Sequence, residues 1–321
     1  MCENMGFGKG LEITMKNHTY KKGYLKVTHG HKLYYELYGN PKGIPVICLH
    51  GGPGAGFSES HKDIFDPKKH NVLLFDQRGS RRSKPFASLK YNTTKYLVQD
   101  IKAFYELLGW ENANIVGGSW GTTLALIFAI HYPKLVNELI LRSTWLGDKP
   151  SLKRYISGAP KDFYPEAWER LLSIVPKQHH KRAIPYHFDK ILKAPPKESR
   201  KYSFSLCCYG LTAAMFHPTP KKLDAMLEYA CYESMGPITS YYMTNGYFVS
   251  GNFIMDNVSR LEDIPIKMIH GKYDAICPLK PIYELSKKLK KAKLSVYLGG
   301  HMGESKGFRN RLVKCVSEII Q

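Results

Sequence analysis

The run Gly117-Gly118-Ser119-Trp120-Gly121 carries the strongest chemical signal in this sequence. An apolar segment typical of a strand precedes it at 112–116, and an apolar segment typical of a buried helix follows it at 122–130. A serine hydroxyl is a weak nucleophile until it is placed against a base. A sharp turn between a strand and a helix raises the hydroxyl above the edge of a sheet, where the helix N-terminus faces the reacting carbonyl. The pattern and its context predict Ser119 as a catalytic nucleophile.

Two later segments typical of buried strands end in side chains that could activate this serine. Asp274 follows the first of them and His301 follows the second, after a pair of glycines. Because open α/β sheets collect their chemistry at the carboxyl ends of the strands, we expect these side chains to share one edge with the serine. His301 would accept the serine proton, and Asp274 would orient the imidazole and stabilise its charged form. Asp256 and Asp263 are alternative acids, but neither directly follows a strong strand.

Glycine-rich loops after the early strands predict the oxyanion hole. His50-Gly51-Gly52-Pro53-Gly54 follows an apolar run, and its glycines would let the main chain approach the substrate. We assign the two oxyanion donors to the backbone N–H groups of Gly52 and Trp120. His50 is expected to make structural hydrogen bonds, and the charged cluster Asp76-Gln77-Arg78-Gly79-Ser80 is expected to be a structural ion-pair network.

The spacing of these motifs predicts one large core with an insertion. About 120 residues in the middle of the chain show no strand alternation, and a loop of that length without structure is rare in a compact domain. We therefore predict an inserted helical cap at 147–259 over the site. The flanking parts, 1–146 and 260–321, then form a single α/β core. Residues 1–22 lack a periodic pattern and are predicted to be a loosely held lead-in.

Trp145 stands where the chain enters the predicted cap. Its position makes it a candidate substrate-binding residue, as an apolar wall for a ring-shaped side chain. An equal alternative is that Trp145 is an ordinary core tryptophan at the boundary between the core and the cap.

The formal net charge of +20 comes from 47 Lys and Arg against 27 Asp and Glu. Such an excess could indicate a nucleic-acid or membrane partner. However, the lysines are spread over many loops, as in Lys21-Lys22 and Lys287-Lys288, and they form no single stripe. We therefore expect solvated surface charge, with neither nucleic acid nor membrane as a partner. No apolar run approaches the roughly 20 residues that a bilayer-spanning helix needs.

The seven cysteines show no spacing typical of a zinc or redox site. We therefore expect reduced thiols in a cytoplasmic protein that uses neither a metal nor another cofactor. Cys277, three residues after Asp274, could make the protein sensitive to thiol reagents without being catalytic. The sequence leaves the oligomeric state open.

The motifs considered together are His50-Gly51-Gly52-Pro53-Gly54, Asp76-Gln77-Arg78-Gly79, Gly117-Gly118-Ser119-Trp120-Gly121, Gly271-Lys272-Tyr273-Asp274 and Gly300-His301. This set resembles the proline iminopeptidase (prolyl aminopeptidase) family of α/β-hydrolases, and the likeness runs from about Gly23 to the C-terminus. The resemblance implies an α/β-hydrolase fold with a mostly parallel central sheet and an inserted helical cap. It also implies a cytosolic, metal-free serine exopeptidase that releases N-terminal proline from small peptides with a free N-terminus.

The chain departs from the family pattern in two places. Family members usually carry a second glycine in the loop, as DQRGxGxS, where this chain has Arg81. The family also binds the substrate's amino group with cap glutamates, and the resemblance implies Glu233 as one of these. The other glutamate usually lies in a W-E-G-E-like stretch. The comparable stretch here, 205–210, includes Tyr209 and has no carboxylate, so half of the ammonium site is expected to be absent.

Three functional hypotheses follow from the sequence. The first is release of N-terminal proline, or of a similar small residue, through an acyl-enzyme on Ser119. The second keeps the same machinery but acts on an ester or a simple amide, because a cap carboxylate is missing. The third is a ligand-binding protein of the same fold with vestigial catalysis, against which the complete Ser119, Asp274 and His301 set argues.

Overall fold

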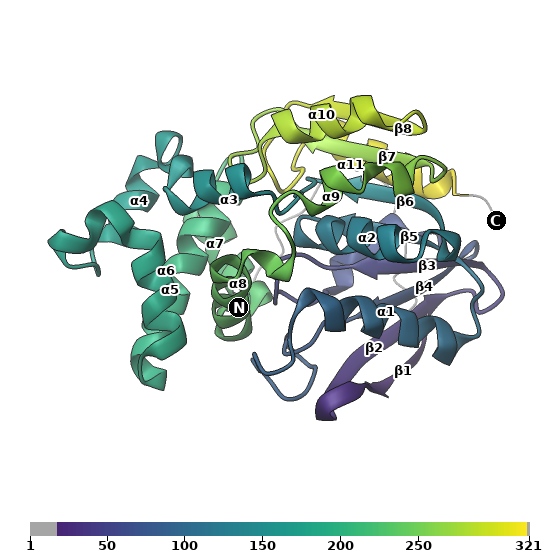
Figure 1. The fold of residues 1–321 in the computed structure, drawn as a ribbon, viewed down its shortest axis with the longest axis horizontal. Helices are drawn as coiled ribbons and strands as arrows, with labels where there is room; N and C mark the ends of the chain where they lie inside the picture. Colours follow the sequence, from purple (N-terminus) through teal and green to yellow (C-terminus); the bar gives the residue numbers. More distant parts are fainter. Residues whose placement is uncertain (1–17, 320–321) are drawn as a thin grey trace, which may run out of the picture.

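The computed structural model describes residues 18–319 and is built around one eight-stranded sheet (Figure 1). The strands lie in the order β1-β2-β4-β3-β5-β6-β7-β8. Their bounds are β1 Thr19–Lys26, β2 Lys32–Gly39, β3 Ile44–Leu49, β4 His70–Phe75, β5 Ala113–Gly118, β6 Val136–Arg142, β7 Ile266–Gly271 and β8 Ala292–Tyr297. Strand β2 pairs antiparallel with β1 and β4, and every other neighbouring pair is parallel. The predicted mostly parallel sheet is confirmed.

The strands in the middle of the sheet are short apolar runs because helices cover both of its faces. Every residue of β4 and of β5 is buried. The edge strand β1 is different, since most of its side chains are exposed and it carries Lys21 and Lys22. The lead-in prediction is therefore wrong for residues 19–22, because an exposed edge strand held by its ladder with β2 needs no apolar pattern. Residues 1–17 of that lead-in lie outside the described part of the chain.

Helices of the core pack on the two faces of the sheet. Their bounds are α1 Thr94–Leu108, α2 Trp120–His131, α9 Phe253–Asp256, α10 Leu279–Lys288 and α11 Lys306–Ser317. One buried cluster contains apolar residues of α1 and α2, such as Phe104 and Phe128. A second cluster joins α11, through Phe308 and Val316, to the opposite face of the central strands. The sheet is thus the middle layer of three.

The segment between β6 and β7 is helical, and most of it stands to one side of the sheet (Figure 1). It contains α3 Lys149–Ile156, α4 Pro165–Leu172, α5 Ala183–Lys193, α6 Pro196–Ala214, α7 Pro220–Ala230 and α8 Tyr232–Thr244. We call α3 to α8 the cap. The short 3-10 helices of the chain are Thr28–Gly30, Glu59–Ile64, Pro133–Leu135, Ala159–Asp162, Lys177–Arg182, Gly246–Phe248 and Val258–Leu261. Helix α9, which ends the insertion, packs back onto α2 of the core.

Helix α8 ties the cap to the glycine-rich loop after β3. The Ser234 hydroxyl donates to the Gly54 carbonyl at 3.1 Å, and the Thr239 hydroxyl donates to the Pro53 carbonyl at 2.8 Å. The first half of α8 therefore lies directly on the loop predicted to hold the oxyanion. Within residues 18–319, no helix combines the length and apolar character needed to cross a membrane.

Candidate active site

Ser119 occupies a strained turn between β5 and α2. Its φ of 55° and ψ of −125° lie outside the regions that ordinary residues prefer. The turn needs small neighbours: a Cβ on Gly121 would lie 2.2 Å from the Leu49 carbonyl oxygen, and one on Gly117 would lie 2.7 Å from the Gly121 carbonyl oxygen. The Ser119 N–H donates to the Arg142 carbonyl at 3.1 Å, which anchors the turn to β6. The predicted strand–turn–helix context of Ser119 is confirmed.

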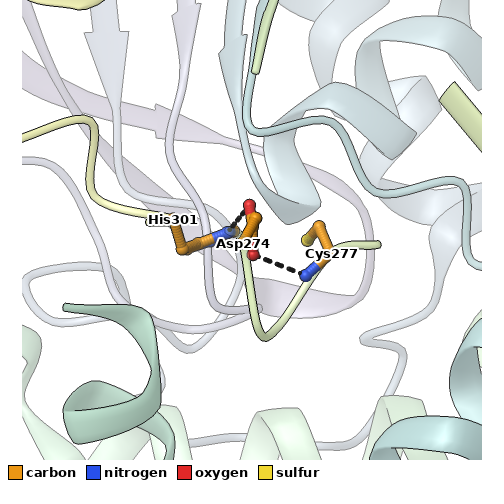
Figure 2. A group of neighbouring side chains, drawn as sticks. All are labelled: Asp274, Cys277 and His301. Carbon is orange, nitrogen blue, oxygen red and sulfur yellow. Dashed lines mark hydrogen bonds and ion pairs between the residues drawn. The ribbon is translucent and has the colours of Figure 1, made fainter. Parts of the chain in front are cut away.

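The loops after β7 and β8 bring the predicted acid and base together. His301 Nδ1 lies 2.9 Å from Asp274 Oδ2, and both side chains are buried (Figure 2). The Ile276 and Cys277 N–H groups donate to Asp274 Oδ1 at 2.9 and 2.7 Å. Figure 2 shows His301 and the Cys277 backbone approaching the carboxylate from opposite sides. The Ser143 hydroxyl at the end of β6 donates to the His301 carbonyl, which fixes the histidine loop.

The surroundings of Asp274 favour its ionised form. Burial alone would raise the pKa of this carboxyl group, but the charge and hydrogen bond of His301, the charge of His270 and the N–H of Cys277 hold it below its ordinary value. A second histidine, His270, has its Nε2 3.7 Å from Asp274 Oδ2 and 2.9 Å from the Cys277 carbonyl. Burial lowers the pKa of His270, and the nearby Asp274 charge offsets this shift only in part. The alternative acid Asp263 is fully exposed and pairs with Lys291.

The loop at 50–54 lies against the serine turn. A Cβ on Gly51 would stand 3.1 Å from the Ser119 Cβ, so a larger residue there would press on the serine. Gly52 has a φ of +113°, and a Cβ there would lie 2.7 Å from the Gly54 nitrogen. In the described part of the chain, no acceptor takes a hydrogen bond from the backbone N–H of Gly52 or of Trp120. Both groups are therefore free to donate to a ligand.

Hydrogen bonds under this loop confirm the structural reading of His50 and of the neighbouring charged motif. The Gln77 N–H donates to His50 Nε2 at 3.0 Å, and the Trp120 indole donates to the Gln77 side chain at 2.9 Å. Burial lowers the pKa of His50. Arg78 is buried and forms two 2.7 Å bonds with Asp100. These groups brace the site and contribute no acid or base to it.

Arg81 stands where the resemblance implies a family glycine, and its backbone adopts a conformation that favours glycine. Its φ is +38°, in the left-handed region that favours glycine. Its N–H contacts the Ser234 hydroxyl at 3.4 Å, and its stem fills the space where a Cβ on Gly56 would stand. The Arg81 side chain therefore contributes to packing beside Gly56, and its backbone to the contact with α8.

A small cavity of about 30 Å³ opens at the serine. Its lining residues are Gly52, Ser119, Trp120, Trp145, Tyr155, Met243, Tyr247, Ile276 and Cys277. The predicted wall residue Trp145 is thus placed at the cavity, together with Ser119 and both predicted oxyanion donors. Sequence reasoning missed Tyr155 of α3 and Tyr247, which follows α8, because no spacing distinguishes them from the many other tyrosines of the chain.

The cap carboxylate predicted from the resemblance lies elsewhere. Glu233 lies in the first turn of α8, is partly exposed and pairs with Arg200 at 3.0 Å, and it does not line the cavity. Its role stays a prediction. Tyr209 is buried, donates to the Gly158 carbonyl at 3.2 Å and packs on the Trp168 ring. The position where a family carboxylate is expected to be missing is therefore occupied by Tyr209, whose phenol ring packs within the cap.

One group among the described residues has the donor set of a metal site. Asp274, Cys277 and His301 offer ligand atoms within 4.8 Å of one another. The hydrogen bonds among these residues favour a role in proton transfer, since both oxygens of the Asp274 carboxylate already accept hydrogen bonds. Burial and the nearby Asp274 charge raise the pKa of the Cys277 thiol well above its ordinary value, so it remains protonated. A protonated thiol is a poor nucleophile and a poor metal ligand.

Comparisons with known proteins agree with this geometry. A family model described as the alpha/beta hydrolase fold matches residues 44–303. Among solved structures, a proline iminopeptidase-related protein from Thermus thermophilus superposes with a TM-score of 0.62 at 22% identity, over 92% of this chain and 97% of the other. A thermophilic esterase from Thermogutta terrifontis superposes with a TM-score of 0.66 at 16% identity, over 93% and 97%. These two likenesses show the fold.

Curated relatives define the family more narrowly. The chain is 33% identical to a proline iminopeptidase of Arabidopsis thaliana, over 92% of this chain and 78% of the relative. It is 32% identical to that of Neisseria gonorrhoeae, over 94% and 96%, and 34% identical to that of Xylella fastidiosa, over 88% and 91%. With the serine turn, the buried acid–base pair and the oxyanion loop in place, the chain belongs to the proline iminopeptidase family of α/β-hydrolases.

Proposed function

We propose that this protein is a serine exopeptidase that releases N-terminal proline, or a similar small residue, from peptides. The observation that carries the proposal is the 2.9 Å pairing of His301 with the ionised Asp274 at the sheet edge that also bears Ser119. The names of the curated relatives support this substrate class. The cavity beside Ser119 is lined by aromatic side chains, against which a ring can pack.

The first half of the reaction forms an acyl-enzyme. Because Asp274 holds Nδ1 of His301, the other ring nitrogen, Nε2, is the one that takes the proton from the Ser119 hydroxyl. The serine oxygen attacks the carbonyl carbon of the first residue, and the developing O⁻ accepts hydrogen bonds from the N–H groups of Gly52 and Trp120. The imidazolium then gives its proton to the leaving amine, and the carbon–nitrogen bond breaks.

The second half releases the residue. His301 takes a proton from water, and the resulting hydroxide attacks the ester carbonyl. Collapse of the second tetrahedral intermediate returns the proton to Ser119 and frees the amino acid. His301 carries every proton while Asp274 stays ionised, so the proposed mechanism uses neither metal nor cofactor.

Substrate recognition is proposed to involve Trp145 as an apolar wall and Glu233 as a carboxylate for the substrate's ammonium group. Trp145 lines the cavity, where a flat ring packs well against an indole. Glu233 precedes Ser234, which contacts the oxyanion loop at Gly54. To bind substrate, Glu233 would exchange its surface pair with Arg200 for the incoming cation.

Ester hydrolysis is the alternative that one observation favours. Among the described residues that line the cavity, none is a carboxylate, so an uncharged acyl group also fits there. The same serine machinery would cleave such an ester.

The experiment that tests the proposal compares the wild-type protein with Ser119→Ala on proline 4-nitroanilide and 4-nitrophenyl acetate. We expect proline release to dominate in the wild type and kcat to fall by about three or more decades in the variant, with an unchanged melting temperature. Substantial activity in a folded Ser119→Ala protein would exclude Ser119 as the nucleophile. Hydrolysis of the acetate ester alone would favour the esterase.

A further inference from the structure

Gln77 is a buried amide that bonds to both halves of the oxyanion hole. It follows β4, which lies beside β3 in the sheet, and it is 2% exposed. Its Nε2 donates to the His50 carbonyl at 3.0 Å, and its Oε1 accepts the Trp120 indole N–H at 2.9 Å. A carbonyl only accepts and an indole only donates, so these partners fix which way the amide points. One side chain thus joins the loop that contains Gly52 to the residue that supplies the other donor.

The backbone of Gln77 determines where His50 carries its proton. Burial lowers the pKa of His50, and the Asp76 charge offsets this shift only in part, so near neutral pH the ring has one N–H. The Gln77 N–H donates to Nε2 at 3.0 Å, so the proton is on Nδ1, which donates to the Gly51 carbonyl at 2.8 Å. The Gly56 N–H lies farther from Nδ1, at 3.2 Å. The tautomer that would accept it would set the Nε2 proton against the Gln77 N–H.

The hydrogen bond from His50 aims the first oxyanion donor. The carbonyl of Gly51 and the N–H of Gly52 belong to one planar trans peptide, in which the two groups point in opposite directions. Holding the carbonyl against His50 therefore turns the N–H to the other side of the peptide. Gly52 lines the cavity at Ser119, and no acceptor within residues 18–319 takes its backbone N–H.

The side chain of Gln77 reaches the second donor through the indole of Trp120. Trp120 is the first residue of α2 and is buried. Its ring stacks on Tyr247 with the centroids 5.3 Å apart, and its Nε1–H is held by Gln77. The residue is thus fixed on one face of its ring and at the ring edge. An oxyanion hole works only when both donors lie about 3 Å from the charged oxygen, so the separation of the two N–H groups matters.

We propose that Gln77 is a positioning residue that aligns the two oxyanion donors, Gly52 through His50 and Trp120 through its indole. Gln77 touches no substrate and acts through the two residues that it holds. The proposal rests on the serine hydrolysis argued above, and it applies to an amide or an ester substrate, because both pass through a tetrahedral oxyanion.

Such a role predicts a loss of kcat with little change in KM. The oxyanion donors bond most strongly to an oxygen that is charged in the transition state, so they contribute little to binding of the ground state. Complete removal of one donor lowers kcat by about 10²- to 10³-fold in serine hydrolysis. A misaligned pair that keeps both N–H groups should lose less than this.

The test compares Gln77→Met with the wild type on proline 4-nitroanilide and 4-nitrophenyl acetate. Methionine keeps the length of the side chain and removes both of its hydrogen bonds. We expect kcat to fall by about tenfold to a hundredfold on each substrate that the wild type cleaves, with KM within about threefold. The rate at which a fluorophosphonate probe labels Ser119 should fall by a similar factor, because the oxygen on phosphorus occupies the same hole.

Asn71→Leu is the matched control, near the opposite end of β4. The Asn71 amide is also buried, donates to the Pro41 carbonyl at 2.9 Å and accepts the Tyr20 hydroxyl at 2.7 Å. Its replacement removes a similar pair of hydrogen bonds away from the site and should leave kcat within about twofold of the wild type. Melting temperatures are measured for both variants, and an equal fall of kcat in the two would overturn the assignment.

Trp120→Phe breaks one of the two side-chain bonds of Gln77 from the other side and keeps the backbone N–H. It should lower kcat by about threefold to tenfold, again with little change in KM. This variant tests the Trp120 half of the proposal even where Gln77→Met does not fold. Wild-type kcat in either variant when folded, or a rise in KM with kcat unchanged, would overturn the assignment.

Failure of the exopeptidase function has a separate signature, namely a wild-type protein that cleaves the ester and releases no proline. The ester and the probe then still test Gln77, because both form their bond at Ser119. A loss of ester kcat and of labelling in Gln77→Met that Asn71→Leu does not share would support the assignment in that case too. A wild type that reacts with none of the three reagents would contradict both the function and the assignment.

Discussion

At the scale of single residues, the structure explains why Asp274 rather than a neighbouring aspartate faces the histidine. Its Oδ1 is held by two backbone N–H groups of its own loop, so the carboxylate can turn only its Oδ2 toward His301. That choice could be predicted from sequence because the residue directly follows a buried strand. The pairing of Glu233 with Arg200 could not be predicted, since it depends on how cap helices pack.

Replacing Asp274 by asparagine should reduce kcat for proline 4-nitroanilide by about 10²- to 10⁴-fold. The amide can hydrogen-bond the ring but does not stabilise the imidazolium that forms during the reaction. Asp263→Asn removes an equal charge from a fully exposed side chain and should leave kcat within twofold of the wild type. Steady-state kinetics on both variants would decide the matter, and the reverse ranking would show that Asp274 is not the acid.

At the scale of secondary-structure elements, the alternation of strands and helices determines where the elements that carry the site lie. The buried strands and α1, which ends at Gly109 with a φ of 65°, have apolar patterns that sequence reasoning can use. Strand β1 has no such pattern, because its side chains face solvent and its stability comes from the backbone ladder with β2. The cap could be predicted as helical from its length and composition, but the order in which its helices surround the cavity depends on tertiary contacts.

The turn that carries Ser119 should tolerate no side chain at Gly121. A methyl group there would stand 2.2 Å from the Leu49 carbonyl oxygen, so β3 or α2 would have to move. We expect Gly121→Ala to destabilise the protein by several kcal/mol, within the range of severe overpacking. Urea unfolding monitored by tryptophan fluorescence would measure the loss.

Gly23→Ala in β1 is the matched control for this substitution. A methyl group at Gly23 makes ordinary contacts at 3.4 Å with the Tyr35 ring. It should change the free energy of unfolding by less than about 1 kcal/mol. Similar losses in the two variants would mean that the turn is not as tightly packed as described.

At the scale of the whole molecule, a set of histidines with lowered pKa values makes stability depend on pH. Burial lowers the pKa of six of them: His31, His50, His61, His70, His187 and His270. In the unfolded chain each would titrate near its ordinary value of 6.5. As pH falls below 6.5 the unfolded chain therefore binds protons that the folded protein refuses, and stability falls.

His187 in the cap gives this effect a measurable size. Its pKa is lowered to about 4, mainly by burial, while its ring contacts the Ala183 carbonyl and the Ser205 hydroxyl. A shift from 6.5 to about 4 corresponds to about 3 kcal/mol, present in full above about pH 7 and lost as the pH falls to 4.

The free energy of unfolding of wild type and His187→Gln should therefore be compared at pH 7 and pH 4. We expect the wild type to lose about 3 kcal/mol more than the variant over this interval. Parallel pH profiles would show that His187 titrates normally in the folded protein.

The position of the cap within the chain also orders events during synthesis. Ser119 and the oxyanion loop are translated before the cap, whereas Asp274 and His301 follow it, in the loops after β7 and after β8, the edge strand. A ribosome that has made the first half of the chain has therefore exposed a nucleophile without its base. The centre is complete only when the last strand docks on the sheet, after the cap has emerged. A nascent chain thus has no hydrolytic activity until that last strand has docked.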